Sequence, residues 1–312
     1  MKKLTKFYLY LEGEFLNKIA IVVLNYENYW DTIECLISLL EQKECNIEII
    51  VIDNGSKNES IDYLKEFSDY PNITIISSPE NLGFSQGNNI GIHYAIETLK
   101  IKKVFVLNND TIIDDEFFFE KLNQIQYSRN IGAIGVKIYG SDNLNQNPIY
   151  KEMTYGKLGK DFIAMRFNKF FMKVKRKKEM RSSNYDASIK SEETLVGNYF
   201  MLHGSAIFLT ENYLERIPGL YNRTFLYYEE SILALLLKKN KLSFLYHDAI
   251  SLYHKEDKSS EISFQNKSTV KLNYLLSSIR KSFPIIYKSP RSIKKEVFLT
   301  SKKALSKAEV WK

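Results

Sequence analysis

The sequence has few of the features that mark several common protein classes. Its 312 residues include only two cysteines, Cys35 and Cys45, which lie ten apart without a partner motif, so neither a disulfide framework nor a zinc site is expected. No uninterrupted apolar run approaches the ~18 residues of a membrane span. Glu12 and Glu14 interrupt the stretch after the basic N-terminus, which argues against a secretory signal. We therefore expect a cytoplasmic protein.

Two motifs of nucleotide-binding folds are also missing. A P-loop requires Gly-Lys followed by Ser or Thr, but Gly156-Lys157 precedes leucine and Gly159-Lys160 precedes aspartate. The first expected strand is followed by Asn-Tyr-Glu-Asn at residues 25–28, instead of the glycine-rich turn of a dinucleotide-binding Rossmann fold. Neither a P-loop NTPase nor a dinucleotide-binding enzyme is expected.

Positive charge is abundant but unevenly placed. The net charge of the chain is +7, yet residues 1–150 hold 13 Lys or Arg and 21 Asp or Glu. Residues 151–190 hold 12 basic and 4 acidic side chains, and residues 255–312 hold 14 and 5. Two segments rich in aromatic or apolar residues thus carry the excess. We expect them to contact something anionic, with lipid headgroups, a lipid-linked phosphate and nucleic acid as candidates.

Expected strands and helices alternate along the first half of the chain, with short polar connections. This pattern predicts βαβ units and an α/β fold with a mostly parallel central sheet flanked by helices. The expected strands are 19–24, 47–52, 73–76, 103–107 and 132–138, then 195–209 as a strand and its return, 242–246 and 249–253. The expected helices run to about residue 40, over 59–67, to about 99, over 115–126 and over 230–239.

Two regions fall outside this alternation. Residues 140–193 are rich in Asn, Lys, Ser and Tyr and include the basic run 173–178, which predicts a mobile insertion or lid. Residues 265–312 combine apolar side chains with many Lys and Arg, which suits a helix or hairpin on an anionic membrane surface. The alternative for this second region is that its apolar residues pack on the core while the lysines are solvated.

Polar residues follow the expected strands where an open α/β sheet binds ligands. Asp53 ends the second strand, where a carboxylate can accept a hydrogen bond from the imide N–H of uracil or thymine; the alternative is an Asx-turn with Asn54-Gly55. Asn108, Asn109 and Asp110 end the fourth strand. Asp110 offers a hard oxygen ligand of the kind Mg²⁺ or Mn²⁺ prefers, and its alternative role is to cap a helix beginning near residue 114.

Glycines spaced by four occupy one face of the third expected helix. Gly83, Gly87 and Gly91 permit close approach of a ligand or of the sheet, and the nearby Asn81, Asn88 and Asn89 favour a polar ligand. Close packing of the helix on the sheet is the alternative.

Two adjacent acids, Glu229 and Glu230, follow an aromatic run late in the chain. Neighbouring carboxylates in a partly dry setting repel each other, which raises proton affinity and suits a general base. Stabilisation of a helix N-terminus is the alternative. His254 ends a short expected strand, with Ser259 just beyond it, and a lone histidine is more often structural than a ligand.

These pieces together resemble the family-2 inverting glycosyltransferases with the GT-A fold, especially bacterial rhamnosyltransferase-like enzymes that build O-antigen or capsule. The matching segments contain Asn25 and Tyr26, Asp53 to Ser56, Asn81 to Gly91, Asn108 to Thr111, Tyr227 to Glu230, and His254 with Ser259. The resemblance covers about residues 18–260. It divides the chain into an extension (1–17), a glycosyltransferase domain (18–260) and a basic amphipathic tail (261–312). Within the domain it implies a nucleotide-binding half (18–138), a basic insertion (140–193) and an acceptor and catalytic half (194–260).

The resemblance implies a role for each matching residue. Asn25, Tyr26, Asp53, Asn54, Asn81, Gly83, Asn88, Asn108 and Asn109 would bind a UDP- or dTDP-sugar, with Asp53 on the nucleobase and Asn108 near the ribose. Asp110 would hold Mg²⁺ or Mn²⁺ at the diphosphate, with His254 as a further contact. The late acidic element of the family usually reads Glu-Asp; here Glu230 takes the position of the base and Glu229 stays an alternative.

The resemblance also implies the partners. The acceptor would be a glycan or lipid-linked oligosaccharide in bacterial surface polysaccharide synthesis, met at the inner face of the cell membrane by peripheral contact. Two rival hypotheses are a non-catalytic nucleotide-sugar-binding protein and a nucleic-acid-binding protein that uses the basic segments. The retained acidic pair argues against the first. Because the basic segments lie outside the α/β pattern with its strand-end acids, we expect no nucleic acid.

Overall fold

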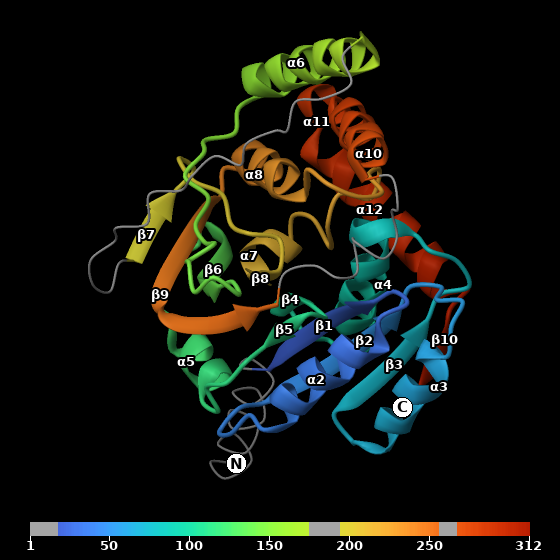
Figure 1. The fold of residues 1–312 in the computed structure, drawn as a ribbon. Helices are drawn as coiled ribbons and strands as arrows, with labels where there is room; N and C mark the ends of the chain where they lie inside the picture. The colour runs from blue at the N-terminus through green and yellow to red at the C-terminus, as the bar shows by residue number, and fades with distance from the viewer. Residues whose placement is uncertain (1–17, 175–193, 256–266) are drawn as a thin grey trace.

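A ten-stranded mixed sheet organises the chain (Figure 1). The computed structural model describes residues 18–174, 194–255 and 267–312. The order of the strands across the sheet is β10-β3-β2-β1-β4-β8-β6-β9-β5, and β7 pairs with β9. The strands are β1 (Ile19–Asn25), β2 (Ile47–Asp53), β3 (Ile73–Ser77), β4 (Val104–Asn108), β5 (Thr111–Ile112), β6 (Ile131–Tyr139), β7 (Thr194–Gly197), β8 (Ala206–Leu209), β9 (Ser243–His254) and β10 (Glu309–Trp311).

The first half of the sheet is parallel, as the sequence predicts. Strands β3, β2, β1 and β4 are neighbours that run in the same direction, and nearly all of their residues are buried because helices cover both faces. Asn25 pairs with Asp53, and Leu24 pairs with Asn108. The polar residues that end β2, β1 and β4 therefore stand in a row along one edge of the sheet.

The second half of the sheet differs from the sequence prediction in two places. Residues 195–209 do not form a strand and its return, because β7 pairs with β9 while β8 lies antiparallel between β4 and β6. The two strands expected at 242–253 are a single strand, β9, which pairs parallel with β6 and has an irregular register between His247 and Ser251. A bulge of this kind looks like a strand break in the sequence because it interrupts the alternation of side chains.

Helices cover both faces of the sheet, and each face has its own apolar core. Helices α2, α3 and α5 pack on one face, and α4, α7, α8 and the C-terminal helices pack on the other (Figure 1). The helices are α2 (Tyr29–Leu40), α3 (Ser60–Lys65) with a 3₁₀ turn (Glu66–Asp69), α4 (Gly83–Glu97), α5 (Phe118–Gln124), α6 (Tyr155–Val174), α7 (Glu211–Leu214), α8 (Glu229–Lys239), α10 (Lys267–Ser282), α11 (Pro284–Tyr287) and α12 (Pro290–Leu305).

Close packing, and not a ligand, explains two glycines of α4. A Cβ atom on Gly87 would lie 2.6 Å from the side chain of Leu24, and one on Gly91 would lie 2.6 Å from that of Val22. Both partners belong to β1, so these glycines let the helix approach the sheet. The preference for a polar ligand at this face of the helix was wrong for these two positions.

The basic insertion contains regular structure that its composition does not suggest. Residues 155–174 form α6, which lies above α8 and beside the C-terminal helices (Figure 1). Residues 175–193 of the insertion lie outside the described residues, as do the N-terminal extension 1–17 and Ser259. No helix among the described residues has the length and apolar character to cross a membrane.

The C-terminal segment is part of the folded domain. Its buried residues Ile279, Ile285 and Val297 join the core beneath α4 and α8, and α12 packs along α4. Strand β10 pairs with β3 and forms the edge of the sheet. For these buried residues the alternative role, packing on the core, applies, because the core and not a membrane buries them. The large apolar side chains that remain exposed among the described residues of this segment are Ile286, Tyr287, Leu299 and Val310, and peripheral membrane contact stays a prediction.

Candidate functional site

Hydrogen bonds join Asn25 and Asp53 at the ends of β1 and β2. The amide of Asn25 donates to Asp53 Oδ1 over 2.8 Å, and its carbonyl oxygen accepts from Thr32 at the start of α2. Ser56 donates to the same carboxylate through its hydroxyl (2.5 Å) and through its backbone N–H (3.3 Å). The backbone bond closes a local turn at Asp53 one residue longer than the Asx-turn given as its alternative role. The nucleobase contact of Asp53 stays a prediction, as does that of the half-buried Tyr26 beside it.

The residues that end β4 point in different directions. Asn109 turns inward, where its amide donates to the backbone carbonyl of Asn28 and to the hydroxyl of Thr32. Asn108 is half-buried, and its backbone N–H donates to the carbonyl of Ser205 over 2.8 Å. Asp110 lies in the turn between β4 and β5, and the next helix begins only at Phe118, so Asp110 does not cap it. Asn109 thus holds α2, whereas Asp110 belongs to the strand-end site.

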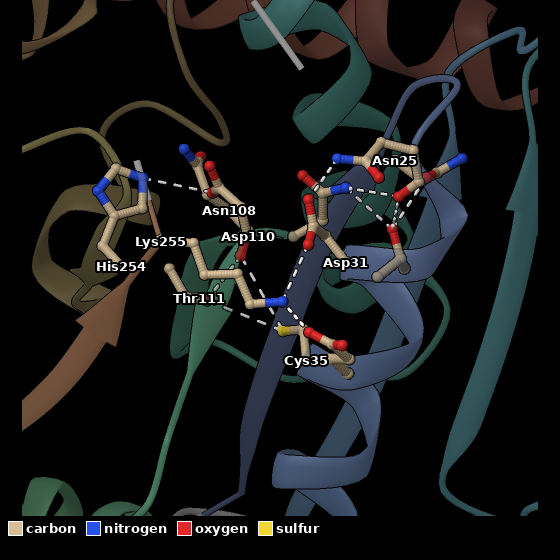
Figure 2. Close-up of polar contacts among 12 residues, drawn as sticks. Asn25, Asp31, Cys35, Asn108, Asp110, Thr111, His254 and Lys255 are labelled. Atoms are coloured by element: carbon tan, nitrogen blue, oxygen red, sulfur yellow. Dashed lines mark hydrogen bonds and ion pairs between the residues drawn. The ribbon is translucent and has the colours of Figure 1, made fainter. Parts of the chain in front are cut away.

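Asp110 and His254 meet although 144 positions separate them in the chain. Because β5 pairs antiparallel with the end of β9, His254 Nε2 lies 3.3 Å from Asp110 Oδ1 (Figure 2). The other ring nitrogen, Nδ1, lies 3.0 Å from the amide oxygen of Gln146, which fixes the orientation of the ring. Nε2 of His254 and the carboxylate of Asp110 thus face each other, and an imidazole nitrogen and a carboxylate oxygen can both bind a cation.

Two residues of this site were missed in the sequence. The ring of His203 packs edge-on against His254, with centroids 5.4 Å apart, and its Nδ1 lies 2.9 Å from the hydroxyl of Ser205. Burial, followed by the neighbouring His254, lowers the pKa of His203 to about 4, so its imidazole is neutral at pH 7. Lys255 donates its backbone N–H to the carbonyl of Asp110 and pairs through its ammonium with Asp31 and Glu34 of α2 (Figure 2).

The acidic pair begins α8 after an unusual stretch of backbone. Tyr227 and Tyr228 both adopt left-handed conformations, with φ angles of 68° and 80°. Such angles are costly for residues with a Cβ, and strain of this kind is concentrated at functional sites. The hydroxyl of Tyr228 donates to Asp161 of α6 over 2.7 Å, which helps to hold the loop in place.

The two acids face different surroundings. Glu229 points into a small apolar pocket lined by Phe84, Val106 and Ile232, and its Oε1 is buried without a hydrogen-bond partner. Glu230 lies against Gly204, whose backbone hydrogen-bonds to its carboxylate. Since Gly204 follows His203, the carboxylate of Glu230 is linked through this loop to the Asp110–His254 pair.

Burial changes the acidity of both carboxyls. Desolvation, followed by repulsion from Glu230, raises the pKa of Glu229 to about 8. Desolvation also raises the pKa of Glu230, while backbone hydrogen bonds, including that from Gly204, and the charge of Lys151 act in the opposite direction. A partly dry carboxyl with raised proton affinity suits a general base.

The polar residues around the start of α4 hold its loop. Asn81 Oδ1 accepts from the backbone N–H of Gly83, and Asn54 Oδ1 accepts from that of Leu82. Gly83 has a φ of +77°, and a Cβ there would lie 2.2 Å from the carbonyl oxygen of Phe225. The buried Asn88 donates to the carbonyl of Phe84. The contact of Gly83 with Phe225 brings the second half of the chain against the first; the role of these residues in ligand binding stays a prediction.

The donor set at Asp110 fits a divalent cation that a ligand helps to hold. It offers one carboxylate and one imidazole whose second nitrogen is oriented by Gln146, which is the usual support of a metal-binding histidine. Within the described residues no three His, Cys, Asp or Glu side chains converge on a metal position. The protein would thus supply two ligands, leaving the others to phosphate oxygens and water.

Comparison with known proteins places these observations in a family. The family described as Glycosyl transferase family 2 matches residues 19–198. The chain is 26% identical over 217 residues to the low-salt glycan biosynthesis hexosyltransferase Agl10 of Haloferax volcanii, covering 69% of this chain and 60% of that protein. It is 32% identical over 123 residues to the glycosyltransferase GlyA of Streptococcus pneumoniae, covering 38% of this chain and 16% of that one. The chain thus spans less than two thirds of the length of these relatives.

Solved structures share the fold at low identity. The mannosyltransferase PcManGT from Pyrobaculum calidifontis, in complex with GDP-Man and Mn²⁺, aligns with a TM-score of 0.50 at 11% identity over 96% of this chain and 81% of that one. S. aureus TarS 1-349 in complex with UDP-GlcNAc aligns with a TM-score of 0.52 at 12% identity over 90% and 70%. The architecture is therefore the GT-A fold that the sequence predicts.

The family match covers more than half of the chain, and the site lies where parallel strands of this fold end. The chain belongs to glycosyl transferase family 2.

Proposed function

We propose that this protein transfers a sugar from a nucleotide-diphosphate donor to a hydroxyl group of a glycan or lipid-linked saccharide. The observation that carries the proposal is the convergence of three groups at one edge of the sheet. Asp53 ends β2, the Asp110–His254 pair joins β5 to β9, and Glu230 reaches this pair through the Gly204 loop. Each group matches one part of the reaction: nucleotide, diphosphate and acceptor.

The donor would lie along the row of strand ends. Asn25, Tyr26 and Asp53 form the nucleobase end, where the carboxylate of Asp53 favours uracil or thymine, and the half-buried Asn108 lies nearer the ribose. Asp110 and His254 would hold Mg²⁺ or Mn²⁺, which offsets the charge that grows on the departing diphosphate. One structural neighbour was solved with GDP-Man and Mn²⁺ and another with UDP-GlcNAc, which supports a nucleotide sugar as the donor class.

The chemical step is a single displacement with inversion. Glu230 accepts the proton of the acceptor hydroxyl as its oxygen attacks C1 of the sugar. The bond from C1 to the phosphate oxygen breaks, and the nucleoside diphosphate leaves with that electron pair. Glu229 is less suited to this role because its carboxyl faces the apolar pocket.

The setting follows from the acceptor class. We place the reaction in the synthesis of bacterial surface polysaccharide, such as capsule or O-antigen, at the cytoplasmic face of the membrane with peripheral contact. The similarity to a glycan biosynthesis hexosyltransferase supports a hexosyl donor. The basic segments 151–190 and 255–312 support contact with an anionic surface.

Two variants four residues apart test the proposal. Asp110→Ala removes the carboxylate beside His254, whereas Asp114→Ala removes an exposed carboxylate outside the site. We expect Asp110→Ala to abolish transfer and the Mn²⁺-dependent part of nucleotide affinity, measured by calorimetry, while its thermal unfolding stays cooperative. Asp114→Ala should behave as wild type. Full activity of Asp110→Ala, or of the wild type in excess EDTA, would contradict the cation role.

A further inference from the structure

Helix α6 presents an apolar stripe to solvent. Ile163 is 56% exposed and Phe167 is 60% exposed, and because they lie four residues apart they share one face of the helix. The opposite face is anchored to the domain, since Leu158 is buried and Phe162 and Met165 pack on the core. A helix that is apolar on its outer face as well as on its inner face exposes a second apolar surface to water, which a binding partner can bury.

Basic residues border this stripe on both sides. Lys160 and Arg166 are exposed, and at 3.6 residues per turn they lie about 60° to either side of Ile163. Residues 155–174 contain five Lys or Arg and one acid, Asp161, whose carboxylate accepts from Tyr228 on the inner side. An apolar stripe flanked by cations matches a surface with an apolar interior and an anionic outer layer.

Helix α11 adds a second exposed apolar pair near α6. The ring of Phe162 packs edge-on against Phe283, with centroids 5.5 Å apart, which places α6 beside the turn from α10 into α11 (Figure 1). Just beyond that turn, Ile286 and Tyr287 are 40% and 74% exposed. The segment 267–288 contains five Lys or Arg and no Asp or Glu. This end of the molecule is thus both apolar and basic.

We propose that the outer face of α6, together with Ile286 and Tyr287, docks on an anionic lipid leaflet. The exposed Phe, Ile and Tyr side chains enter the boundary between headgroups and acyl chains, and the flanking lysine and arginine ammonium and guanidinium groups meet the phosphates. Lipid is favoured over a protein partner because the exposed charged residues that flank Ile163 and Phe167, namely Lys160 and Arg166, are both cationic. The surface is therefore an interfacial helix held on a folded domain.

This placement orients the site. Asp161, on the inner side of α6, accepts the hydrogen bond from Tyr228, which directly precedes the acidic pair of α8. Docking through α6 therefore holds the loop before Glu230 close to the leaflet. Resting on the proposed function, this selects an acceptor hydroxyl carried on a lipid-linked saccharide over one on a free glycan.

Sedimentation with vesicles tests the docking surface. The full chain is mixed, at low and at high salt, with vesicles of phosphatidylcholine alone or with vesicles in which about a third of the lipid is phosphatidylglycerol. We expect binding only to the anionic vesicles and release at high salt. Lys160→Gln with Arg166→Gln should weaken binding roughly 25-fold, since each basic residue near the surface contributes about fivefold. Ile163→Ser with Phe167→Ser should weaken it at least as much.

Controls separate docking from folding and from the sugar-transfer proposal. Ile37→Ser with Leu299→Ser removes two similarly exposed apolar residues from other faces and should leave binding unchanged. Phe167→Trp should dock, with an emission blue shift that Leu299→Trp does not show. Thermal stabilisation by nucleotide with Mn²⁺ should persist in every variant. If no variant and no wild-type protein showed this stabilisation, the result would contradict the sugar-transfer proposal and not the docking proposal. Equal binding by the α6 variants, equal binding to neutral vesicles, or a wild-type dimer that the α6 variants split would overturn the proposal.

Discussion

The two acids of α8 offer a paired test, because a change of one residue in position should give opposite results. Replacing Glu230 by Gln keeps its size but removes its ability to accept a proton at the Gly204 loop. Turnover should fall by ~10²-fold or more while donor affinity stays near that of wild type. Replacing Glu229 by Gln changes a carboxyl that faces an apolar pocket, so turnover should fall much less.

The free energy of unfolding of Glu229→Gln and that of the wild type should also differ by an amount that depends on pH. The pKa of Glu229 is raised to about 8 in the folded protein, from 4.5, so above pH 4.5 the folded state binds more protons than the unfolded state. Stability should therefore fall as the pH rises from about 4.5 and level off above about 8. The shift corresponds to at most about 3 kcal/mol lost by pH 7, and relaxation around the carboxyl will reduce it. Glu229→Gln removes this loss, so it should be more stable than wild type at pH 8.

Urea unfolding from pH 4 to pH 9, together with product formation at pH 7.5, measures both effects. We expect the stability difference between Glu229→Gln and wild type to grow between pH 5 and pH 8. We expect Glu230→Gln to lose far more turnover than Glu229→Gln. An inactive Glu229→Gln protein beside an active Glu230→Gln protein would move the base by one residue. A stability difference that does not change with pH would refute the burial argument for Glu229.

Two further predictions concern the frame of the site. Gly83→Ala should destabilise the protein by about 2 kcal/mol or more in urea unfolding, because its Cβ would meet the carbonyl of Phe225 and its φ is positive. An unchanged urea midpoint would show that the backbone around Phe225 can move to accommodate the methyl group. Removing residues 281–312 takes away α11, α12 and β10, so the melting temperature and nucleotide-induced stabilisation should both drop; a shortened chain that melts like the wild type would contradict the structural role of this segment.

The first half of the fold could be predicted because its signals are local. Each parallel strand is a short run of β-branched and apolar residues that ends on a polar residue, as in Val51-Ile52-Asp53. In a parallel sheet such ends meet at one edge, so the neighbouring positions of Asn25, Asp53 and Asn108 followed from the pattern. The meeting of Asp110 with His254 came from the family resemblance and not from the local pattern.

The C-terminal segment shows where a local signal is ambiguous. An amphipathic helix with a basic outer face has the same sequence pattern whether its apolar face meets a protein core or a lipid surface. Ile279 and Ile285 look like membrane contacts in the sequence, yet both are fully buried in the fold. Only the structure separates these from Ile286 and Tyr287, and only the structure shows that Ile163 and Phe167 lie outside the core.

His203 could not be found from the sequence for a topological reason. It lies in a loop before β8, without a motif around it, and it meets His254 only because β8 is inserted antiparallel between β4 and β6. The same insertion brings Gly204 to Glu230. Asn109 shows a contact that its position at a strand end does not suggest, because its amide holds the start of α2; its ligand contact stays a prediction.

The central claim is that the row of strand ends binds a nucleotide sugar with a divalent cation. The most direct measurement is thermal unfolding of the full chain with a panel of UDP-, dTDP- and GDP-sugars, each with Mn²⁺ and with EDTA. The account predicts that a uridine or thymidine donor raises the melting temperature, and that EDTA removes most of the rise. No stabilisation by any nucleotide sugar, or the same stabilisation in EDTA, would contradict it.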